Sequence, residues 1–186
     1  METVISICLG IGLAASVGFR VFLPLFALSL AAYYNVLELN HSWQWLGSLA
    51  TLITLGVATL VEIFAYYIPY IDNLLDSVAI PLATLAGTVV MVSTLVDMDP
   101  VITWSLAIIA GGGTAAAISG SSGAARLAST ASTGGLANPV VSTVETGTSI
   151  LMSIISIVFP IVAIVLVVLI LFIIFKLYNK FKPSKN

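Results

Sequence analysis

Residues 110–145 read AGGGTAAAISGSSGAARLASTASTGGLANPVVSTVE, a stretch built almost wholly from Gly, Ala, Ser and Thr. It carries Arg126 in its interior and Glu145 at its end, and long apolar runs flank it on both sides. Small side chains allow helices to approach closely in a membrane. A charged side chain at bilayer depth is costly and is retained where it faces protein or water. The stretch therefore predicts a polar site inside a helical membrane protein.

The composition excludes a soluble globular protein. Of the 186 residues, 60% are hydrophobic and 8% are charged, and the mean hydropathy is +1.17. An average soluble domain carries roughly 25% charged residues. Because one span needs ~20 apolar residues, the length accommodates about five spans, and we expect an all-α polytopic transmembrane helical bundle. We place this single transmembrane domain at residues 1–178 and a basic tail at residues 179–186.

The lysines all lie near the C-terminus: Lys176, Lys180, Lys182 and Lys185. Cytoplasmic segments next to membrane spans are enriched in Lys and Arg, so the C-terminus is predicted to be cytoplasmic. The N-terminus, METVISICLG, lacks the basic region of a cleaved signal peptide. We therefore interpret it as a retained apolar segment.

The first apolar segment, residues 3–34, is too long for one straight span. A continuous helix would measure ~48 Å, against a hydrocarbon core of ~30 Å. Gly18 and Pro24 flank Arg20 within it, and both weaken a helix. A break near residues 18–24 is therefore predicted. The sequence allows either a kinked span or a re-entrant hairpin here, and the same choice is open for residues 110–145.

Four further apolar segments are predicted to cross the membrane: residues 45–68, 80–96, 101–118 and 146–175, the last with a kink at Pro160. Aromatic side chains typical of membrane interfaces lie at the segment ends: Tyr33, Tyr34, Trp43 and Trp45 on one side, and Tyr66, Tyr67 and Tyr70 on the other. Three successive glycines, residues 111–113, weaken a helix and predict close packing or local unwinding.

Two arginines lie inside apolar or small-residue stretches. Apart from the four C-terminal lysines, Arg20 and Arg126 are the basic residues of the chain, and the candidate carboxylates are Glu62, Asp72, Asp76 and Glu145. A guanidinium at the bilayer centre costs roughly 2.5–3.5 kcal/mol on insertion scales, so we expect both arginines to be paired. Arg20–Glu62 and Arg126–Glu145 are the natural pairs, and the crossed pairing is equally allowed.

Asp72 and Asp76 stand four residues apart, on one face of a short helix predicted at residues 71–78. Like charges at that spacing repel each other unless they are solvated or a positive group lies between them.

Hydroxyl side chains surround Arg126 in the sequence: Ser119, Ser121 and Ser122. Together with free backbone N–H groups and the guanidinium, they form a candidate anion cradle. Asn138 and Pro139 mark a helix break that leaves carbonyl groups free to line water. The charges allow two interpretations: structural ion pairs that fix helix register, or a polar cavity that handles an ion, a proton or an anionic head group.

An internal repeat is a further hypothesis. Ser16 precedes Arg20 as Ser122 precedes Arg126, and a Val-Glu pair follows each arginine. Inverted repeats with broken helices build the site of many transporters. The spacing from Arg to Glu is 42 residues in one half and 19 in the other, so coincidence explains the similarity equally well.

Several functional classes lack sequence support. A single cysteine, Cys8, excludes an internal disulfide and a cysteine metal cluster. His41 is the one histidine and lies in a loop, and the GSSG stretch lacks the strand and partners of a nucleophile elbow. We expect neither enzyme activity nor a cofactor nor a metal. No basic face suggests nucleic-acid binding.

Three stretches carry a family resemblance: GLAASVGFRVFLPL (residues 12–25), VEIFAYYIPYIDNLLDSVAIPLATLAGT (61–88) and GSSGAARLASTASTGGLANPVVSTVE (120–145). Together they resemble a bacterial membrane family known as domain of unknown function 4126, over residues 5–175. The most specific element is E-x-x-A-x-x-I-P-x-x-D-x-x-x-D, which begins at Glu62. The family often has a charged residue after the alanine, where this chain has Tyr66 and Tyr67. The resemblance implies a multi-pass protein of the bacterial inner membrane and carries no activity with it.

The expected function is a transporter or channel for a small solute or ion, with Arg20, Glu62, Arg126 and Glu145 lining the route. A non-transporting scaffold or assembly protein is the alternative, and binding or flipping of an anionic lipid is a third hypothesis. The expected partners are the lipid bilayer, a small ion, anion or lipid head group, and a second copy of the chain.

Overall fold

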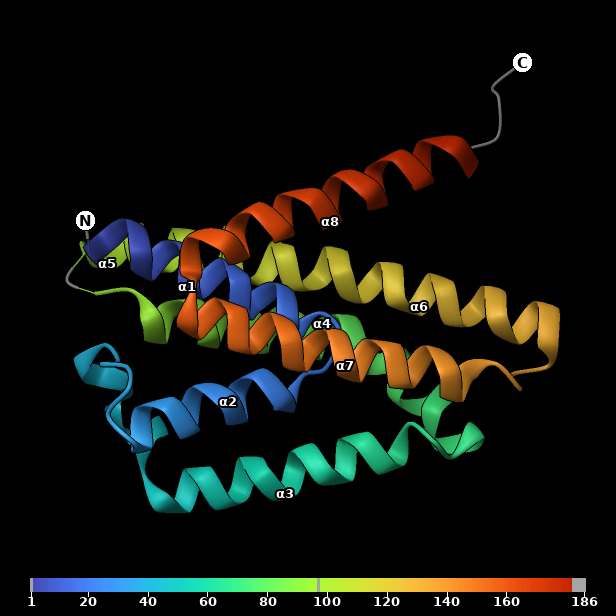
Figure 1. Cartoon of the computed structure of the whole chain (residues 1–186), viewed down its shortest axis with the longest axis horizontal. Coiled ribbons are helices and arrows are strands. Elements are labelled where there is room, and N and C mark those ends of the chain that lie inside the picture. The colour runs from blue at the N-terminus through green and yellow to red at the C-terminus, as the bar shows by residue number, and fades with distance from the viewer. Residues whose placement is uncertain (1, 97, 182–186) are drawn as a thin grey trace.

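Apolar helices account for nearly all of the computed structural model, which describes residues 2–96 and 98–181 (Figure 1). The elements are α1 (Glu2–Val17), α2 (Phe22–Tyr33), the 3₁₀ helix η1 (His41–Gly47), α3 (Leu49–Ala65), α4 (Pro69–Thr94), α5 (Pro100–Leu106), the π-helical segment η2 (Ala107–Gly112), α6 (Gly113–Thr133), α7 (Asn138–Val158) and α8 (Pro160–Phe181). No strand occurs in those residues. The predicted all-α helical bundle is confirmed.

Helices α1 and α2 form a re-entrant hairpin. They run in opposite directions, as Figure 1 shows, and contain 16 and 12 residues. At 1.5 Å per residue they measure ~24 Å and ~18 Å, less than the ~30 Å hydrocarbon core. Residues 18–21 connect them and place Arg20 at the tip. The predicted break is confirmed, and it produces a hairpin and not a kinked span.

Most of the remaining helices are candidate membrane spans. Four are long and apolar enough to span it: Ile71–Thr94, Pro100–Thr133, Asn138–Val158 and Pro160–Lys180. A fifth candidate is the pair His41–Gly47 and Leu49–Ala65, which is bent by 63°. The described chain is therefore a multi-pass membrane protein with four spans, or five if the bent pair counts as one. This agrees with the predicted number of about five.

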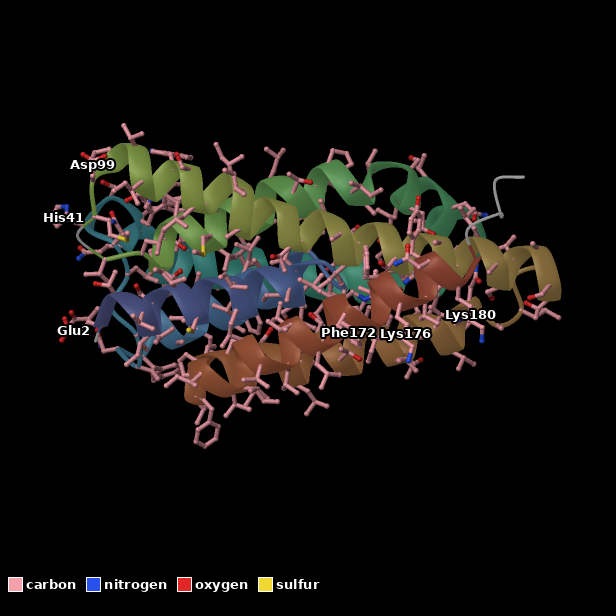
Figure 2. The ribbon with its side chains drawn as sticks, turned by 90° about the horizontal axis from the view of Figure 1, so that it is seen from above. Glu2, His41, Asp99, Phe172, Lys176 and Lys180 are labelled. Carbon is pink, nitrogen blue, oxygen red and sulfur yellow. The ribbon has the colours of Figure 1, made fainter. Side chains whose placement is uncertain are left out.

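The two ends of the bundle carry different charged residues. Glu2, His41 and Asp99 lie at one end in Figure 2, and Lys176 and Lys180 lie toward the other. The hairpin α1–α2 therefore enters the bundle from the end that holds Glu2, opposite the lysines.

Helix α1 is the centre of the packing although it does not span the membrane. It contacts α4, α6, α7 and α8, and Leu13, Ala14 and Val17 are fully buried. Backbone that ends within the hydrocarbon region must be covered by protein, because lipid offers no hydrogen bonds. The surrounding helices supply that cover.

Close backbone contacts replace side-chain packing at two glycines. A Cβ atom on Gly87 would lie 2.8 Å from the carbonyl oxygen of Gly111, and one on Gly18 would lie 2.8 Å from the carbonyl oxygen of Ala115. The contact at Gly87 packs α4 against η2, and the contact at Gly18 packs the hairpin tip against α6. Both expectations are met for Gly111 and Gly112, which pack closely and belong to the π-helical segment, whereas Gly113 has open space around its Cα and begins the regular helix α6.

Two predicted segment boundaries are wrong. The expected short helix at 71–78 and the span at 80–96 are one helix of 26 residues, with Pro81 inside it; membrane helices tolerate proline where neighbouring groups replace the lost hydrogen bond. Residues 146–175 are not one kinked span. α7 ends at Val158 and α8 runs back from Pro160 (Figure 1), because proline favours the first position of a new helix.

The first residues of the predicted tail are helical. Helix α8 continues to Phe181, so residues 179–181 belong to a helix. Residues 182–186, with the predicted tail lysines Lys182 and Lys185, lie outside the described residues.

Candidate functional site

Helix α7 binds the arginine at the hairpin tip. Arg20 is 1% exposed. Its Nε donates to Thr146 Oγ1 at 3.0 Å, and its Nη2 donates to the carbonyl oxygen and the hydroxyl of Ser142 at 2.9 and 2.7 Å. Its Nη1 lies 3.4 Å from a carboxylate oxygen of Glu145. These contacts fix the tip of the hairpin against one face of α7.

Glu62 caps the second helix of the hairpin. Its two carboxylate oxygens accept hydrogen bonds from the backbone N–H groups of Val21 at 2.7 Å and Phe22 at 3.0 Å. The first N–H groups of a helix lack intrahelical partners, and a carboxylate there interacts favourably with the helix dipole. The predicted Arg20–Glu62 pair is therefore wrong. Glu62 holds the start of α2, and Arg20 turns to Glu145.

Arg126 lies at the centre of a charged cluster. We use this name for the two arginines and the four carboxylates around them: Arg20, Arg126, Glu62, Asp72, Asp76 and Glu145. The Nη1 of Arg126 pairs with Asp72, and its Nη2 and Nε both donate to the carboxylate of Glu145, the latter at 3.2 Å. Such two-point contacts are among the strongest hydrogen bonds in proteins. Nη2 also donates to Ser142 Oγ at 3.3 Å. The predicted Arg126–Glu145 pair is present, and because Arg20 shares the same carboxylate, part of the crossed pairing is present as well.

The guanidinium of Arg126 lies between Asp72 and Asp76 and offsets the repulsion that two carboxylates at this spacing would feel. Besides its contact with Asp72, the Arg126 guanidinium lies 3.8 Å from Asp76 through Nε. Asn138 Nδ2 donates to the second oxygen of Asp72 at 3.0 Å and to Thr130 Oγ1 at 3.1 Å. The side chain of Asp76 is 23% exposed, so it is the cluster carboxylate most open to its surroundings.

Tyr66 links the two arginines. Its ring centroid lies 4.1 Å from the guanidinium carbon of Arg20 and 4.3 Å from that of Arg126. A guanidinium is attracted to the face of an aromatic ring at such distances. We predicted Tyr66 as an interfacial aromatic, but it is buried. Its position directly after α3 turns it into the bundle.

The cluster contains more negative than positive groups. Two guanidinium groups, from Arg20 and Arg126, face four carboxylates, from Glu62, Asp72, Asp76 and Glu145. When all six are ionised, the formal charge of the cluster is −2. Two buried polar atoms in it, Arg20 Nη1 and Asn138 Oδ1, find no hydrogen-bond partner in the part of the chain that the structure describes.

The predicted anion cradle is wrong. Helix α6 is continuous from Gly113 to Thr133, so the backbone N–H groups beside Arg126 are already used in the helix. Ser121 Oγ donates to the carbonyl of Ala117 at 2.8 Å. Among the described residues, Ser119, Ser121 and Ser122 make no hydrogen bond to Arg126.

The predicted helix break at Asn138 is present, since residues 134–137 separate α6 from α7. The side chain of Asn138 donates a hydrogen bond to Asp72, so it does not leave a water-lined opening at this point.

The two arginine-bearing stretches do not share a local structure. Arg20 lies in the non-helical connection between α1 and α2, whereas Arg126 lies within the continuous helix α6. The hypothesis of an internal repeat finds no support in this comparison.

Ser142, Thr146 and Tyr66 are cluster residues that the sequence analysis missed. For Ser142 a signal existed: Asn138, Ser142 and Glu145 are spaced by four and three residues, which places them on one helix face.

Two largely apolar clefts reach the cluster from different sides. One, of about 450 Å³, lies between α2, α3 and α4 and includes Glu62 and Tyr66 in its lining. The other, of about 400 Å³, lies between α6, α7 and α8 and includes Glu145, Ser121 and Ser122. Neither resembles a metal site, and no group of three His, Cys, Asp or Glu side chains suited to a metal ion occurs in residues 2–96 and 98–181.

Comparison with known proteins gives a family and no activity. No curated protein and no solved structure matches the chain. A family model described as a domain of unknown function, DUF4126, matches residues 7–180, nearly the whole chain and all the residues of the charged cluster. The chain belongs to the DUF4126 family.

Proposed function

We propose that the protein is a small membrane transporter of cations, with the charged cluster as its binding centre. The observation that carries the proposal is the excess of four carboxylates over two guanidinium groups in a cluster whose arginines are 1% and 3% exposed. Uncompensated charge inside a membrane costs several kcal/mol per group. The cluster therefore favours uptake of a proton or another cation.

The architecture around the cluster suits transport. Broken helices that meet at a polar centre are how many transporters form a site, and here the hairpin tip contributes Arg20 and the helix start bound by Glu62. Asp76 provides the point of exchange with the surroundings, because it is the most exposed carboxylate of the cluster. Small movements of α4 relative to α6 would change its 3.8 Å ion pair with Arg126.

We further propose an orientation in the membrane and a function without catalysis. By the positive-inside rule, the end that carries Lys176 and Lys180 faces the cytoplasm of a bacterial cell, and the hairpin enters from the outer side of the inner membrane. Nothing in the cluster combines a nucleophile with a base, so we propose binding and translocation without covalent chemistry.

Flux measurements in proteoliposomes test the proposal. The wild-type protein is reconstituted with a pH-sensitive dye inside, and proton, sodium and potassium gradients are imposed in turn. Asp76→Asn removes the exposed carboxylate with little change of shape. Glu38→Gln, in the exposed loop before η1, is the matched control. Arg126 is a poor probe here, because its loss leaves buried carboxylates without a partner.

We expect cation flux above protein-free liposomes in the wild type and the Glu38→Gln variant. Asp76→Asn should lower it about tenfold, as loss of ~1.4 kcal/mol of stabilisation would. A wild-type protein without flux would refute transport, and an Asp76→Asn variant with normal flux would refute this route.

A non-transporting scaffold is the second candidate, and one observation favours it. Arg126 is contacted by Asp72, Asp76, Glu145 and Ser142 at once, as expected of ion pairs that fix helix register. Anionic-lipid binding has less support, because the excess charge of the cluster is negative. Absence of flux combined with loss of folding in cluster variants would favour the scaffold.

A further inference from the structure

Within residues 2–96 and 98–181, Glu62 is the cluster carboxylate that forms no direct ion pair with an arginine. Asp72, Asp76 and Glu145 each pair with an arginine. Among the described residues, Glu62 has no ion pair and accepts hydrogen bonds from two neutral backbone N–H groups. It is 7% exposed. The start of α2 stabilises this carboxylate, but no guanidinium binds it directly, so it is the carboxylate of the cluster best able to attract a further cation.

The cleft between α2, α3 and α4 leads from the membrane to this carboxylate. Its walls include Val57 and Val61 on α3, which are 56% and 62% exposed and therefore face lipid. Leu75 and Leu82 on α4 form the opposite wall. At about 450 Å³, the cleft falls in the usual range of small-molecule sites, roughly 300–1,000 Å³.

The inner end of the cleft is suited to a positive group. Glu62 offers lone pairs beyond the two that the backbone uses, since an ionised carboxylate accepts about four hydrogen bonds. Phe22 lines the same cleft, and an aromatic ring attracts an organic cation by ~0.5–2 kcal/mol.

The second cleft provides an internal comparison. It also reaches a carboxylate, that of Glu145, but Arg20 and Arg126 already neutralise that group. A cleft whose carboxylate is already paired with arginines offers a cation no electrostatic gain. The two clefts therefore differ in whether the carboxylate at the inner end is free of an ion pair.

We infer that the α2–α3–α4 cleft is a lateral binding site for lipophilic cations. The apolar or aromatic body of the ligand lies between α3 and α4, and its positive centre lies against Glu62. The cation enters sideways from the bilayer. The inference rests on the proposed function in so far as it names the class of substrate, and it predicts binding whether or not transport follows.

Two probes of the same shape and opposite charge test the inference. Tetraphenylphosphonium is the cation and tetraphenylborate the anion. Binding is measured by equilibrium dialysis with the full chain in nanodiscs of zwitterionic lipid, and nanodiscs without protein provide the background. Glu62→Gln removes the charge and keeps an acceptor oxygen for the start of α2. Ala58→Leu fills the cleft and leaves Glu62 intact. Ala124→Leu, on the exposed face of α6, is the matched control.

We expect saturable binding of tetraphenylphosphonium and none of tetraphenylborate above background. Glu62→Gln and Ala58→Leu should each weaken binding about tenfold or more, equivalent to ~1.4 kcal/mol, while Ala124→Leu binds as the wild type does. Thermal melting of each variant checks folding, and Ala58→Leu tests the cleft even if Glu62→Gln fails to fold. Equal binding of both probes would overturn the inference, as would wild-type affinity in Ala58→Leu or binding no greater than background.

The result separates the two proposals. Binding without flux of any cation leaves the site in place and removes transport. Flux of protons or inorganic cations without tetraphenylphosphonium binding leaves transport in place and overturns the lipophilic substrate.

Discussion

Replacing Arg126 by Met should destabilise the protein strongly, because two carboxylates depend on it. Among the side-chain contacts of the described residues, Asp72 would keep the hydrogen bond from Asn138, and Glu145 the 3.4 Å contact with Arg20. Breaking a buried ion pair by removing one partner costs ~3–5 kcal/mol. Against a typical stability of ~5–15 kcal/mol, this is a fifth of the total or more.

The effect of Asp72→Asn should reverse its sign in that background. In the wild type, the substitution removes a partner of Arg126 and destabilises the protein. In Arg126→Met, it removes an uncompensated buried charge, and the new amide oxygen can still accept the hydrogen bond from Asn138. We expect a gain of ~1–3 kcal/mol there, within the range of coupling energies between contacting residues.

The assay is equilibrium unfolding by SDS in mixed micelles, followed by circular dichroism of the helices. All four members of the double-mutant cycle are measured under one condition. If Asp72→Asn changes the unfolding free energy equally in both backgrounds, the two residues are not coupled and the described cluster does not exist in the folded protein.

Further predictions concern the topology and the tyrosine. With Cys8 replaced by Ser, single cysteines at Glu2 and His41 should react with an impermeant maleimide from one side of the membrane, and one at Lys180 from the other. Labelling of Glu2 and His41 from opposite sides would contradict the hairpin. Tyr66→Phe keeps the ring that faces both guanidinium groups and should melt as the wild type does. Tyr66→Leu should lose about 1–2 kcal/mol, and equal melting of the two variants would show that the ring contacts contribute nothing.

The apolar character of the spans and the pairing of the charged residues could be predicted from sequence, because both depend on local energetics. A run of ~20 apolar residues is placed by the bilayer itself. The pairing of Arg126 with Glu145 and the position of a positive group beside Asp72 follow from the cost of burying an isolated charge.

The partner of Glu62 could not be predicted in this way. Backbone N–H groups occur at every residue, so a carboxylate that binds Val21 and Phe22 leaves no signature in the sequence. The hairpin and the kinked span have the same composition over residues 3–34, and only tertiary packing separates them. Helix reversal at Pro160 was missed for the same reason, because a kink and a turn both place proline within a long apolar run.

A measurement of charge movement tests the proposed transport function most directly. A rapid step in proton or sodium concentration is applied to proteoliposomes on a solid-supported membrane, and the displaced charge is recorded for the wild type, Asp76→Asn and Glu38→Gln. We predict a charge displacement in the wild type and in Glu38→Gln that is lost in Asp76→Asn. A wild-type protein that displaces no charge, or an Asp76→Asn variant that displaces as much as the wild type, would contradict cation transport through the cluster of Arg20, Arg126 and their carboxylates.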